Sequence, residues 1–582
     1  MKKLIAFLSG ALLLSACSDN NYPGPEQNEG VVRSFLTVSL VTPKSATRAD
    51  DYENGTDSEN EVNNVRFYFF YDGGSPALVF KQAASNSYLS YIDWTPESGD
   101  FGSGDDSQTV EKIVTATLGI NMPANNNGFP DLVLAVINPT PDVLAIPGNP
   151  SLETLVSTVG DYYTDLHDNN FVITNSVYAD GNPIATVNAT PIDENCFQPT
   201  IDETKGNELI IYVERVLARL DFTIGMTNGQ IIPGTDVTIY PVGTQIINSW
   251  DEDLENTSSQ EETIYVQFLG WNITQTPSAS YLVKNINPRW PSDLFKNLEL
   301  WNSDNYSRSF WAINPPADKF EYIYGSWNKP TNGDGGNYAT ALPIPSDEAV
   351  TAYMQENAAP NDDTTLPPTN PTEVIIGAQL VDASGNSLTL VRWANRYYTQ
   401  EGAKNAIANV LELYSLSGNT YTKIKPSQLE FVTAKDIYGE TLPDDVADYY
   451  AYVQLTDAAR SLTWYNGNGI TSSATPYESI TAVNNYIIDR INYLMVWNSG
   501  QTYYYFEIQH LGANESPAYF GVVRNHLYKC SLTSIEGLGT PVYSPEQTIK
   551  PEKPGGDQSV LTVQIDILQW RVVNQKYELT WP

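Results

Sequence analysis

Residues 31–41 read Val-Val-Arg-Ser-Phe-Leu-Thr-Val-Ser-Leu-Val, and this short segment is the clearest indication of the fold. Apolar side chains recur in it at every second position, with Ser34 as the polar exception; the apolar positions are Val32, Leu36, Val38 and Leu40. Because successive side chains of a strand point to opposite faces of a sheet, this spacing predicts a β-strand with one buried face. The strand is expected to end at Pro43, and the small, polar and acidic residues 45–55 predict an exposed loop.

The composition of all 582 residues agrees with a protein made of strands. Aromatic residues make up 12% of the chain, and Tyr, which like Val, Ile and Thr favours strands, occurs 37 times. The 38 Gly and 37 Pro supply many turns, and no long segment keeps the period of an amphipathic helix. We therefore predict an all-β protein with a few short helices, and at roughly 150 residues per domain the length suggests two to four domains.

The chain is strongly acidic, with a formal net charge of −38. Such a surface repels nucleic acid and anionic membranes, so the charge argues against a nucleic-acid-binding protein. A well-solvated secreted protein carries the same kind of surface, and this is the simpler interpretation.

The first residues have the pattern of a lipoprotein signal. A short positive start leads into an apolar core over residues 4–14, which is too short to span a bilayer as a helix of the mature protein. The following Leu14-Ser15-Ala16-Cys17 has the form of a bacterial lipobox, so we predict a signal peptide over residues 1–17 and lipidation, palmitate included, at Cys17. An ordinary signal peptide with an incidental cysteine is the alternative. Residues 18–30 read as a flexible tether, and the expected precursor is a lipoprotein of the outer membrane.

The first strand and the C-terminal segment have features that fit an exchange of strands between subunits. Thr47-Arg48-Ala49 lies in the exposed loop after the first strand, where a trypsin-like protease could reach the backbone. At the far end, a Pro/Gly-rich linker precedes two strand-like runs, residues 560–567 and 570–579. Their candidate strand residues are Leu561, Val563, Ile565, Ile567, Trp570, Val573, Tyr577 and Leu579. A removable first strand and spare last strands fit a protein that polymerises by lending a strand, although the last strands could instead belong to the subunit's own second domain.

No set of catalytic or metal-binding residues stands out. The three histidines, His167, His510 and His526, have no metal-binding spacing, and a structural hydrogen-bonding role is the simpler expectation for the last two. Cys196 and Cys530 could pair, but two isolated thiols are favoured because nothing in the spacing demands a bridge. We expect no enzyme activity, no metal and no cofactor.

Several stretches resemble the fimbrillins of Bacteroidales, the stalk subunits of type V fimbriae, and especially the short-fimbria (minor fimbrillin) branch. The stretches are residues 213–219 (Val-Glu-Arg-Val-Leu-Ala-Arg), 268–273 (Phe-Leu-Gly-Trp-Asn-Ile), 308–312, 353–357, 510–512, 521–528, 537–542 and 567–573. The resemblance implies two β-sandwich domains of transthyretin-like, Greek-key architecture with long loops. The expected divisions are a tether with removable strand at 18–48, a first domain at 49–225, a second at 226–550, and a linker with donor strands at 551–582.

The resemblance also implies a sequence of processing and assembly steps. An arginine-specific surface protease would cut after Arg48, leaving Ala49 as the new first residue. The strand that carries Leu36, Val38 and Leu40 would then leave, and the C-terminal strand of another subunit would fill its groove. The product would be a fimbria, or pilus, at the cell surface that supports adhesion and biofilm. Expected partners are copies of the chain or related fimbrillins, anchor and tip subunits, the protease, and host or bacterial surface ligands.

Two other functions stay open. The first is a tip or accessory adhesin of the same fimbrial system. The second is a monomeric surface lipoprotein that binds glycans, which the many aromatic residues and the lipobox would suit.

Overall fold

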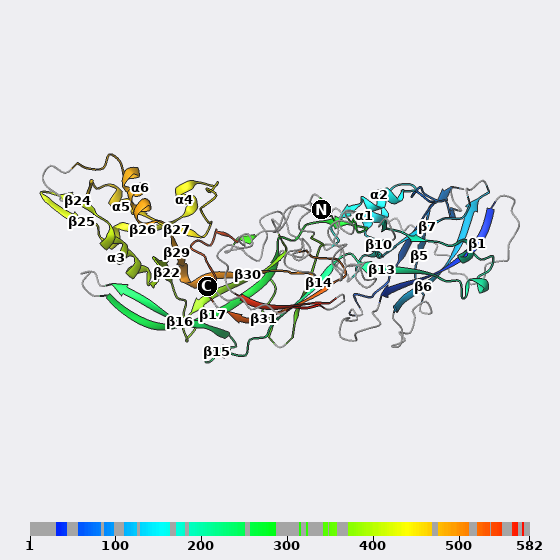
Figure 1. Cartoon of the computed structure of the whole chain (residues 1–582), viewed down its shortest axis with the longest axis horizontal. Helices are drawn as coiled ribbons and strands as arrows, with labels where there is room; N and C mark the ends of the chain where they lie inside the picture. The colour runs from blue at the N-terminus through cyan, green and yellow to red at the C-terminus, as the bar shows by residue number, and fades with distance from the viewer. Residues whose placement is uncertain are drawn as a thin grey trace, which may run out of the picture. The chain divides into compact units, whose positions relative to one another are not determined.

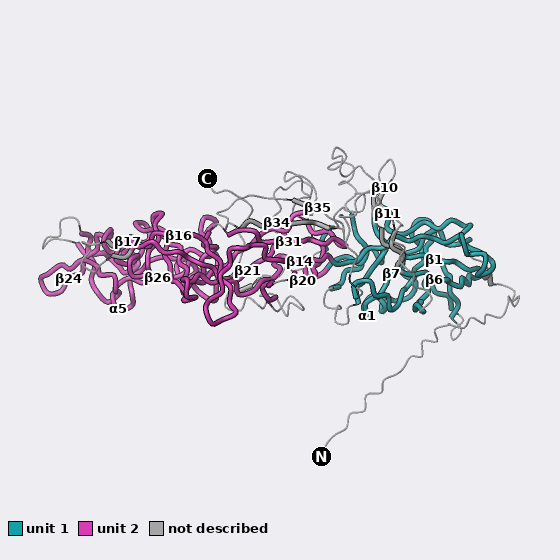
Figure 2. Tube along the Cα trace, turned by 90° about the horizontal axis from the view of Figure 1, so that it is seen from below, with its two compact units in different colours: residues 1–217, 280–315 teal, residues 218–279, 316–582 magenta. Residues whose placement is uncertain are grey.

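The structure is a computed structural model of the whole chain. It describes residues 31–43, 56, 58–82, 87–97, 110–124, 128–162, 170–180, 185–250, 257–286, 313–315, 322–323, 341–346, 348–357, 371–467, 475–510, 521–535, 537–549, 561–568 and 573–575. The chain divides into two compact units, residues 1–217 with 280–315 and residues 218–279 with 316–582 (Figure 2). The first division falls between Leu217 and Ala218. The sequence predicted a domain boundary near residue 225. Residues 280–315, which follow the first strands of the second unit in the sequence, belong to the first unit.

The first unit is built on an eight-stranded sheet with the order β5-β2-β7-β9-β13-β1-β6, to which β12 adds beside β7. The bounds are β1 (Val31–Pro43), β2 (Val65–Phe70), β5 (Tyr91–Trp94), β6 (Val110–Pro123), β7 (Leu132–Ile137), β9 (Ile173–Asn175), β12 (Thr190–Pro191) and β13 (Leu209–Arg215). All six residues of β2 are buried, so its apolar run fills the interior on both faces.

Short elements complete the first unit. They are β3 (Phe80–Lys81), β4 (Tyr88–Leu89), β8 (Val159–Gly160), β10 (Tyr178–Asp180), β11 (Ala185–Val187), β18 (Ser280–Tyr281), α1 (Pro141–Leu144), α2 (Leu152–Val156) and the 3-10 turns η2 (Glu194–Cys196) and η3 (Asp202–Thr204). Thr140 and Ser151 cap the two helices, because each side chain accepts a hydrogen bond from a backbone N–H in the first turn.

The second unit contains two large sheets. One has five strands in the order β20-β14-β31-β34-β35, and the other has eleven, with the path β26-β27-β29-β22-β23-β16-β17-β21-β30-β32 and β15 beside β16. The five-stranded sheet consists of β14 (Ala218–Ile224), β20 (Val350–Met354), β31 (Leu527–Ile535), β34 (Leu561–Leu568) and β35 (Val573–Gln575). The other consists of β15 (Gln230–Ile231), β16 (Thr238–Trp250), β17 (Thr257–Thr274), β21 (Glu373–Val381), β22 (Leu390–Trp393), β23 (Arg396–Tyr398), β26 (Leu429–Thr433), β27 (Tyr450–Leu455), β29 (Leu494–Trp497), β30 (Gln501–Glu507) and β32 (Thr540–Pro541).

One hydrophobic core joins these two sheets. Phe222 of β14 and Tyr528 of β31 lie in the same buried cluster as Trp271 of β17, Ile376 of β21 and Tyr504 of β30. Two sheets that share their inner faces form a sandwich. The fold class predicted from the sequence, all-β with few short helices, is confirmed.

A lobe with its own core extends the eleven-stranded sheet (Figure 1). Its further elements are α3 (Gln400–Val410), β24 (Leu413–Ser417), β25 (Thr420–Lys423), η7 (Pro426–Gln428), α4 (Ala434–Tyr438), α5 (Asp457–Arg460), β28 (Trp464–Asn466) and α6 (Ile480–Ile491). Elsewhere in the second unit lie β19 (Tyr322–Ile323), η8 (Asn498–Gly500) and β33 (Thr548–Ile549).

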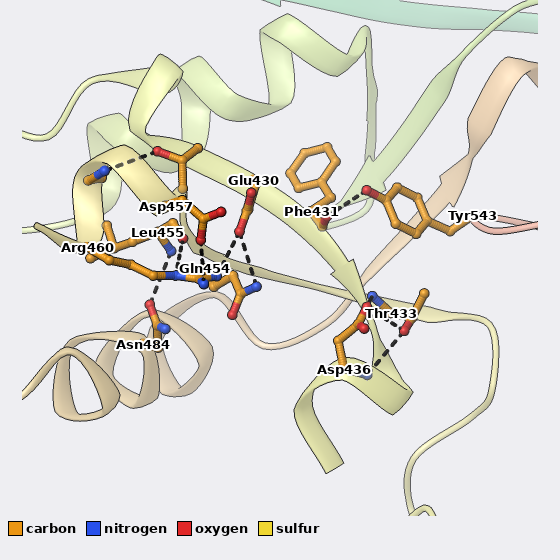
Figure 3. A network of polar contacts seen from close by, with 12 residues as sticks. Glu430, Phe431, Thr433, Asp436, Gln454, Leu455, Asp457, Arg460, Asn484 and Tyr543 are labelled. Carbon is orange, nitrogen blue, oxygen red and sulfur yellow. Dashed lines mark hydrogen bonds and ion pairs between the residues drawn. The ribbon is translucent and has the colours of Figure 1, made fainter. Parts of the chain in front are cut away.

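Polar contacts fasten the β26–β27 hairpin of this lobe to its helices (Figure 3). Arg460 donates from one guanidinium nitrogen to Glu430 at 2.8 Å and from another to Asp457 at 2.8 Å. Asn484 on α6 accepts from the backbone N–H of Leu455 at 3.1 Å. These groups hold neighbouring elements together, so we assign them a structural role.

Candidate functional site

Strand β1 lies inside its sheet, with β6 on one side and β13 on the other. It pairs with β6 in antiparallel register along its whole length, from Val31 opposite Pro123 to Pro43 opposite Val110. It pairs with β13 in parallel register, from Val38 opposite Leu209 to Val41 opposite Tyr212. A first strand in this position has hydrogen-bonded neighbours on both edges, so taking it away would leave a gap between β13 and the edge strand β6.

One face of β1 is apolar and completely buried at Leu36, Val38 and Leu40, each of which is 0% exposed. The residues opposite them on β6 are Leu118, Ala116 and Val114, and these are buried as well. On β13, Leu209 and Ile211 lie opposite Val38 and Leu40. Each such aliphatic side chain stabilises the unit by about 1.5–3 kcal/mol through burial. The three residues that the sequence singled out therefore lie together on one buried face of β1.

The other face of β1 is held by hydroxyl groups, whose hydrogen-bond partners the sequence does not reveal. The Thr37 hydroxyl donates to that of Thr204 at 2.7 Å, inside the protein. The Ser39 hydroxyl donates to the Glu208 carboxylate at 2.7 Å. Because Thr204 and Glu208 directly precede β13, these bonds tie β1 to the strand with which it runs parallel. A signal was present in the sequence, since Thr37 and Ser39 alternate with the apolar residues.

At the other end of the chain, β34 has a place in the second unit's own sheet. It pairs with β31 in antiparallel register, from Leu561 opposite Ile535 to Leu568 opposite Leu527. Its other neighbour is the three-residue β35, which carries Val573. Leu561, Val563, Ile565 and Ile567 occupy every second position of β34.

Some predicted site residues lie outside the described part of the chain. These are the lipidation residue Cys17, the cleavage residues Arg48 and Ala49, and the donor residues Trp570, Tyr577 and Leu579.

The two C-terminal histidines meet in the interior of the second unit. Their rings are 5.0 Å apart and both side chains are buried. His510 Nδ1 is 3.0 Å from the Tyr528 hydroxyl, and His526 Nδ1 is 2.8 Å from the backbone oxygen of Arg524. The contacts belong to strand ends and turns, and no group of three or more His, Cys, Asp or Glu side chains that could hold a metal occurs among the described residues.

Each unit also contains a buried ion pair. In the first, the Lys284 ammonium is 3.1 Å from a Glu214 carboxylate oxygen. In the second, the Arg524 guanidinium is 2.6 Å from Glu356. All four side chains are almost fully buried, so neither pair faces a substrate-accessible surface.

The two described cysteines are free thiols. Cys530 is buried in β31, Cys196 is partly exposed, and burial raises the pKa of the Cys196 thiol. No helix in the described residues is long and apolar enough to cross a membrane.

Comparison with known families identifies the C-terminal region. Residues 495–576, which run from β29 to the end of β35, match the family model described as "Major fimbrial subunit protein type IV, Fimbrillin, C-terminal". The resemblance to fimbrillins predicted from the sequence is thereby confirmed. A search of curated proteins found no match.

Solved structures give similar but distant neighbours. A fimbrillin from Porphyromonas gingivalis has 12% identity and a TM-score of 0.34, with 93% of this chain and 98% of that chain covered. The tip fimbrial protein of the same organism, truncated at its C-terminus, has 9% identity and a TM-score of 0.29, with 92% and 100% covered. A fimbrial assembly protein from Parabacteroides distasonis has 12% identity and a TM-score of 0.26, with 61% and 89% covered.

Proposed function

We propose that this chain, which is similar to fimbrillins in its C-terminal region, is a stalk subunit of a cell-surface fimbria and polymerises by strand exchange. The family match supports a fimbrial subunit at the cell surface. The processing steps and the exchange are the finer part of the proposal.

The place of β1 between β13 and β6, with hydrogen-bonded neighbours on both of its edges, is the observation that carries the proposal. Its loss would uncover a groove between β6 and β13 whose floor is apolar at Leu118, Ala116 and Ile211. An apolar groove bounded by two strand edges binds another strand, because both main-chain hydrogen bonds and side-chain burial are available to it.

Cleavage would control when the groove opens. The chain would be exported as a lipoprotein through Cys17 and cut after Arg48, shortly after β1 ends at Pro43. The cut leaves β1 bound only by hydrogen bonds and burial, so another strand can replace it. Before the cut, the subunit's own strand occupies the groove and blocks premature assembly.

The donor would be the C-terminal segment of a second copy. Its first half carries Leu561, Val563, Ile565 and Ile567, and its second half carries Trp570, Val573, Tyr577 and Leu579. Burial of such residues at about 1.5–3 kcal/mol each would give an association that scarcely dissociates, even after the cost of ordering the strand. A head-to-tail contact of this kind does not close on itself, so it builds a filament.

The pairing of β34 with β31 favours one alternative. A subunit that keeps β34 in its own sheet has no strand to lend and would end a filament, as a tip or accessory adhesin does. Adhesion to host or bacterial surface ligands, and a contribution to biofilm, would follow for either role.

Proteolysis of the purified protein tests the proposal. Protein spanning residues 18–582 is treated briefly with an arginine-specific protease and followed by N-terminal sequencing and a non-denaturing gel. We expect a new N-terminus at Ala49 and a ladder of oligomers. Arg48→Ala should give neither, and an 18–558 truncation should be cut without forming the ladder. Cleavage of the full-length protein without a ladder would favour the tip adhesin or a monomeric glycan-binding lipoprotein.

A further inference from the structure

Ser34 is a polar residue on the otherwise apolar face of β1. It shares this face with Leu36, Val38 and Leu40, and it is only 5% exposed. It lies opposite Ile120 of β6, a fully buried residue. Among the residues that the structure describes, its hydroxyl has no hydrogen-bond partner. A buried hydroxyl without a partner is unfavourable, because it has given up hydrogen bonds to water and gained nothing in return.

The hydroxyls on the opposite face of the same strand differ from Ser34. Thr37 donates to Thr204 and Ser39 donates to Glu208, both at 2.7 Å. The polar residues of that face therefore stabilise β1, whereas Ser34 weakens its fit. The one poorly matched position lies on the face that any replacement strand must also fill.

The first half of the C-terminal segment has no such mismatch. Leu561, Val563, Ile565 and Ile567 provide four apolar side chains at every second position. Residues 34, 36, 38 and 40 of β1 form four positions with the same spacing. With the two sets aligned over the four positions, an apolar residue takes the place of Ser34 whichever way the incoming strand runs.

We propose that Ser34 is a built-in mismatch that makes β1 the weaker occupant of its own groove. The groove then selects a strand with an apolar side chain at the Ser34 position, and residues 561–567 of a second copy provide one. The inference rests on the proposed strand exchange and adds a driving force to it. The uncut subunit keeps β1 because the strand is tethered, and the cut subunit loses it because a better-fitting strand is present.

A matched pair of variants tests the mismatch. Ser34→Ala and Ser39→Ala remove the same hydroxyl atom from the two faces of one strand. After protease treatment of labelled protein, we measure how long the N-terminal fragment stays bound and how fast oligomers form. Ser34→Ala should hold the fragment about tenfold longer and slow assembly by a similar factor, whereas Ser39→Ala should shorten retention by a similar factor.

The outcomes separate this inference from the proposed function. If Ser34→Ala releases the fragment as fast as the original protein or faster, the hydroxyl is satisfied and the mismatch is refuted, even where oligomers form. If the original protein gives no cleavage at Arg48 or no ladder, strand exchange fails instead. Thermal unfolding of the uncut protein then still tests Ser34. The mismatch requires a higher unfolding temperature of the first unit for Ser34→Ala and a lower one for Ser39→Ala, and the reverse order would overturn it.

Discussion

Strands β1 and β34 have nearly the same apolar pattern, and each lies next to the edge strand of its sheet, but their edge strands differ in length. β1 pairs along its whole length with the edge strand β6 and over Val38–Val41 with β13, whereas β34 pairs along its whole length with the interior strand β31 and has the three-residue β35 at the edge. The first strand is thus part of the framework of its unit, because its loss would separate the long strand β6 from the sheet, whereas the loss of β34 would separate only the three residues of β35. The comparison teaches that the neighbouring strands, together with the fit of the strand's own side chains, determine how easily a strand can be given up.

A charged residue placed in β1 or in β34 should give the largest difference in the stability of the first unit. Val38→Asp puts a carboxylate on the buried face of β1, and we expect the first unit to lose more than about 4 kcal/mol of unfolding free energy. Ile565→Asp in β34 should leave the first unit intact and abolish oligomer formation. Thermal unfolding and the protease assay measure the two effects.

Ile210→Asp is the control for this pair. Ile210 lies on the neighbouring β13 but is 51% exposed, so the same change in chemistry should alter stability by less than about 0.5 kcal/mol. A first unit that stays fully stable with Val38→Asp would show that β1 is not part of its framework.

The buried ion pair of the second unit should give the next largest effect. Glu356→Ala leaves the Arg524 guanidinium buried without its carboxylate partner. Arg524 lies only a few residues before β31, the strand that pairs with β34. We expect a loss of about 3–5 kcal/mol in the second unit, measured by denaturant unfolding. Glu261→Ala, on an exposed position of β17, is the control and should change little. Equal losses for both variants would contradict a structural role for the pair.

A pH dependence should also distinguish the units. Burial raises the pKa of Glu507, at the end of β30, to about 7. A raised folded-state pKa means that folding favours the protonated carboxyl. The contribution of Glu507 to the stability of the second unit is therefore full below the unfolded-state pKa and is lost as pH rises through 7. We expect the second unit to be about 2–3 kcal/mol less stable at pH 8 than at pH 4, apart from other titrating groups.

Glu507→Gln should remove this part of the pH dependence and stabilise the second unit at pH 8, while the first unit keeps its profile. Unfolding curves recorded at several pH values would show it. An unchanged profile in Glu507→Gln would mean that the carboxyl titrates normally.

The smallest effect concerns the polar face of β1. Thr37→Val replaces the hydroxyl that donates to Thr204 with a methyl group of similar size. We expect a loss of about 1 kcal/mol in the first unit, seen as a lower unfolding temperature. Thr244→Val, at an exposed pair between β16 and β17, should have almost none. A stabilised Thr37→Val would mean that this face does not help to hold the strand.

The local features of the fold could be predicted from the sequence. The alternation of Leu36, Val38 and Leu40 gives a strand with one buried face, because that period is a property of the segment itself. The choice of β6 and β13 as neighbours could not be predicted, since it depends on contacts between residues far apart in the chain. The same holds for Lys284, which lies after the first strands of the second unit but pairs with Glu214 in the first.

Helix α6 is an element that the sequence pattern did not predict. Its Ile, Val, Thr and Tyr residues favour strands, and the segment was not predicted to be helical. Two signals were nevertheless present. Ser479 caps the first turn by accepting from the Ala482 N–H, and the buried Val483, Ile487 and Ile491 recur at every fourth position.

The length of the β1–β6 pairing has a mechanical consequence. The two strands run side by side from Val31 to Pro43, and any strand that takes the place of β1 would inherit that alignment. Tension along such a strand acts in shear on all of its hydrogen bonds at once, instead of peeling them apart one by one. A strand bound in this place would therefore resist pulling along its own length far better than prying across it.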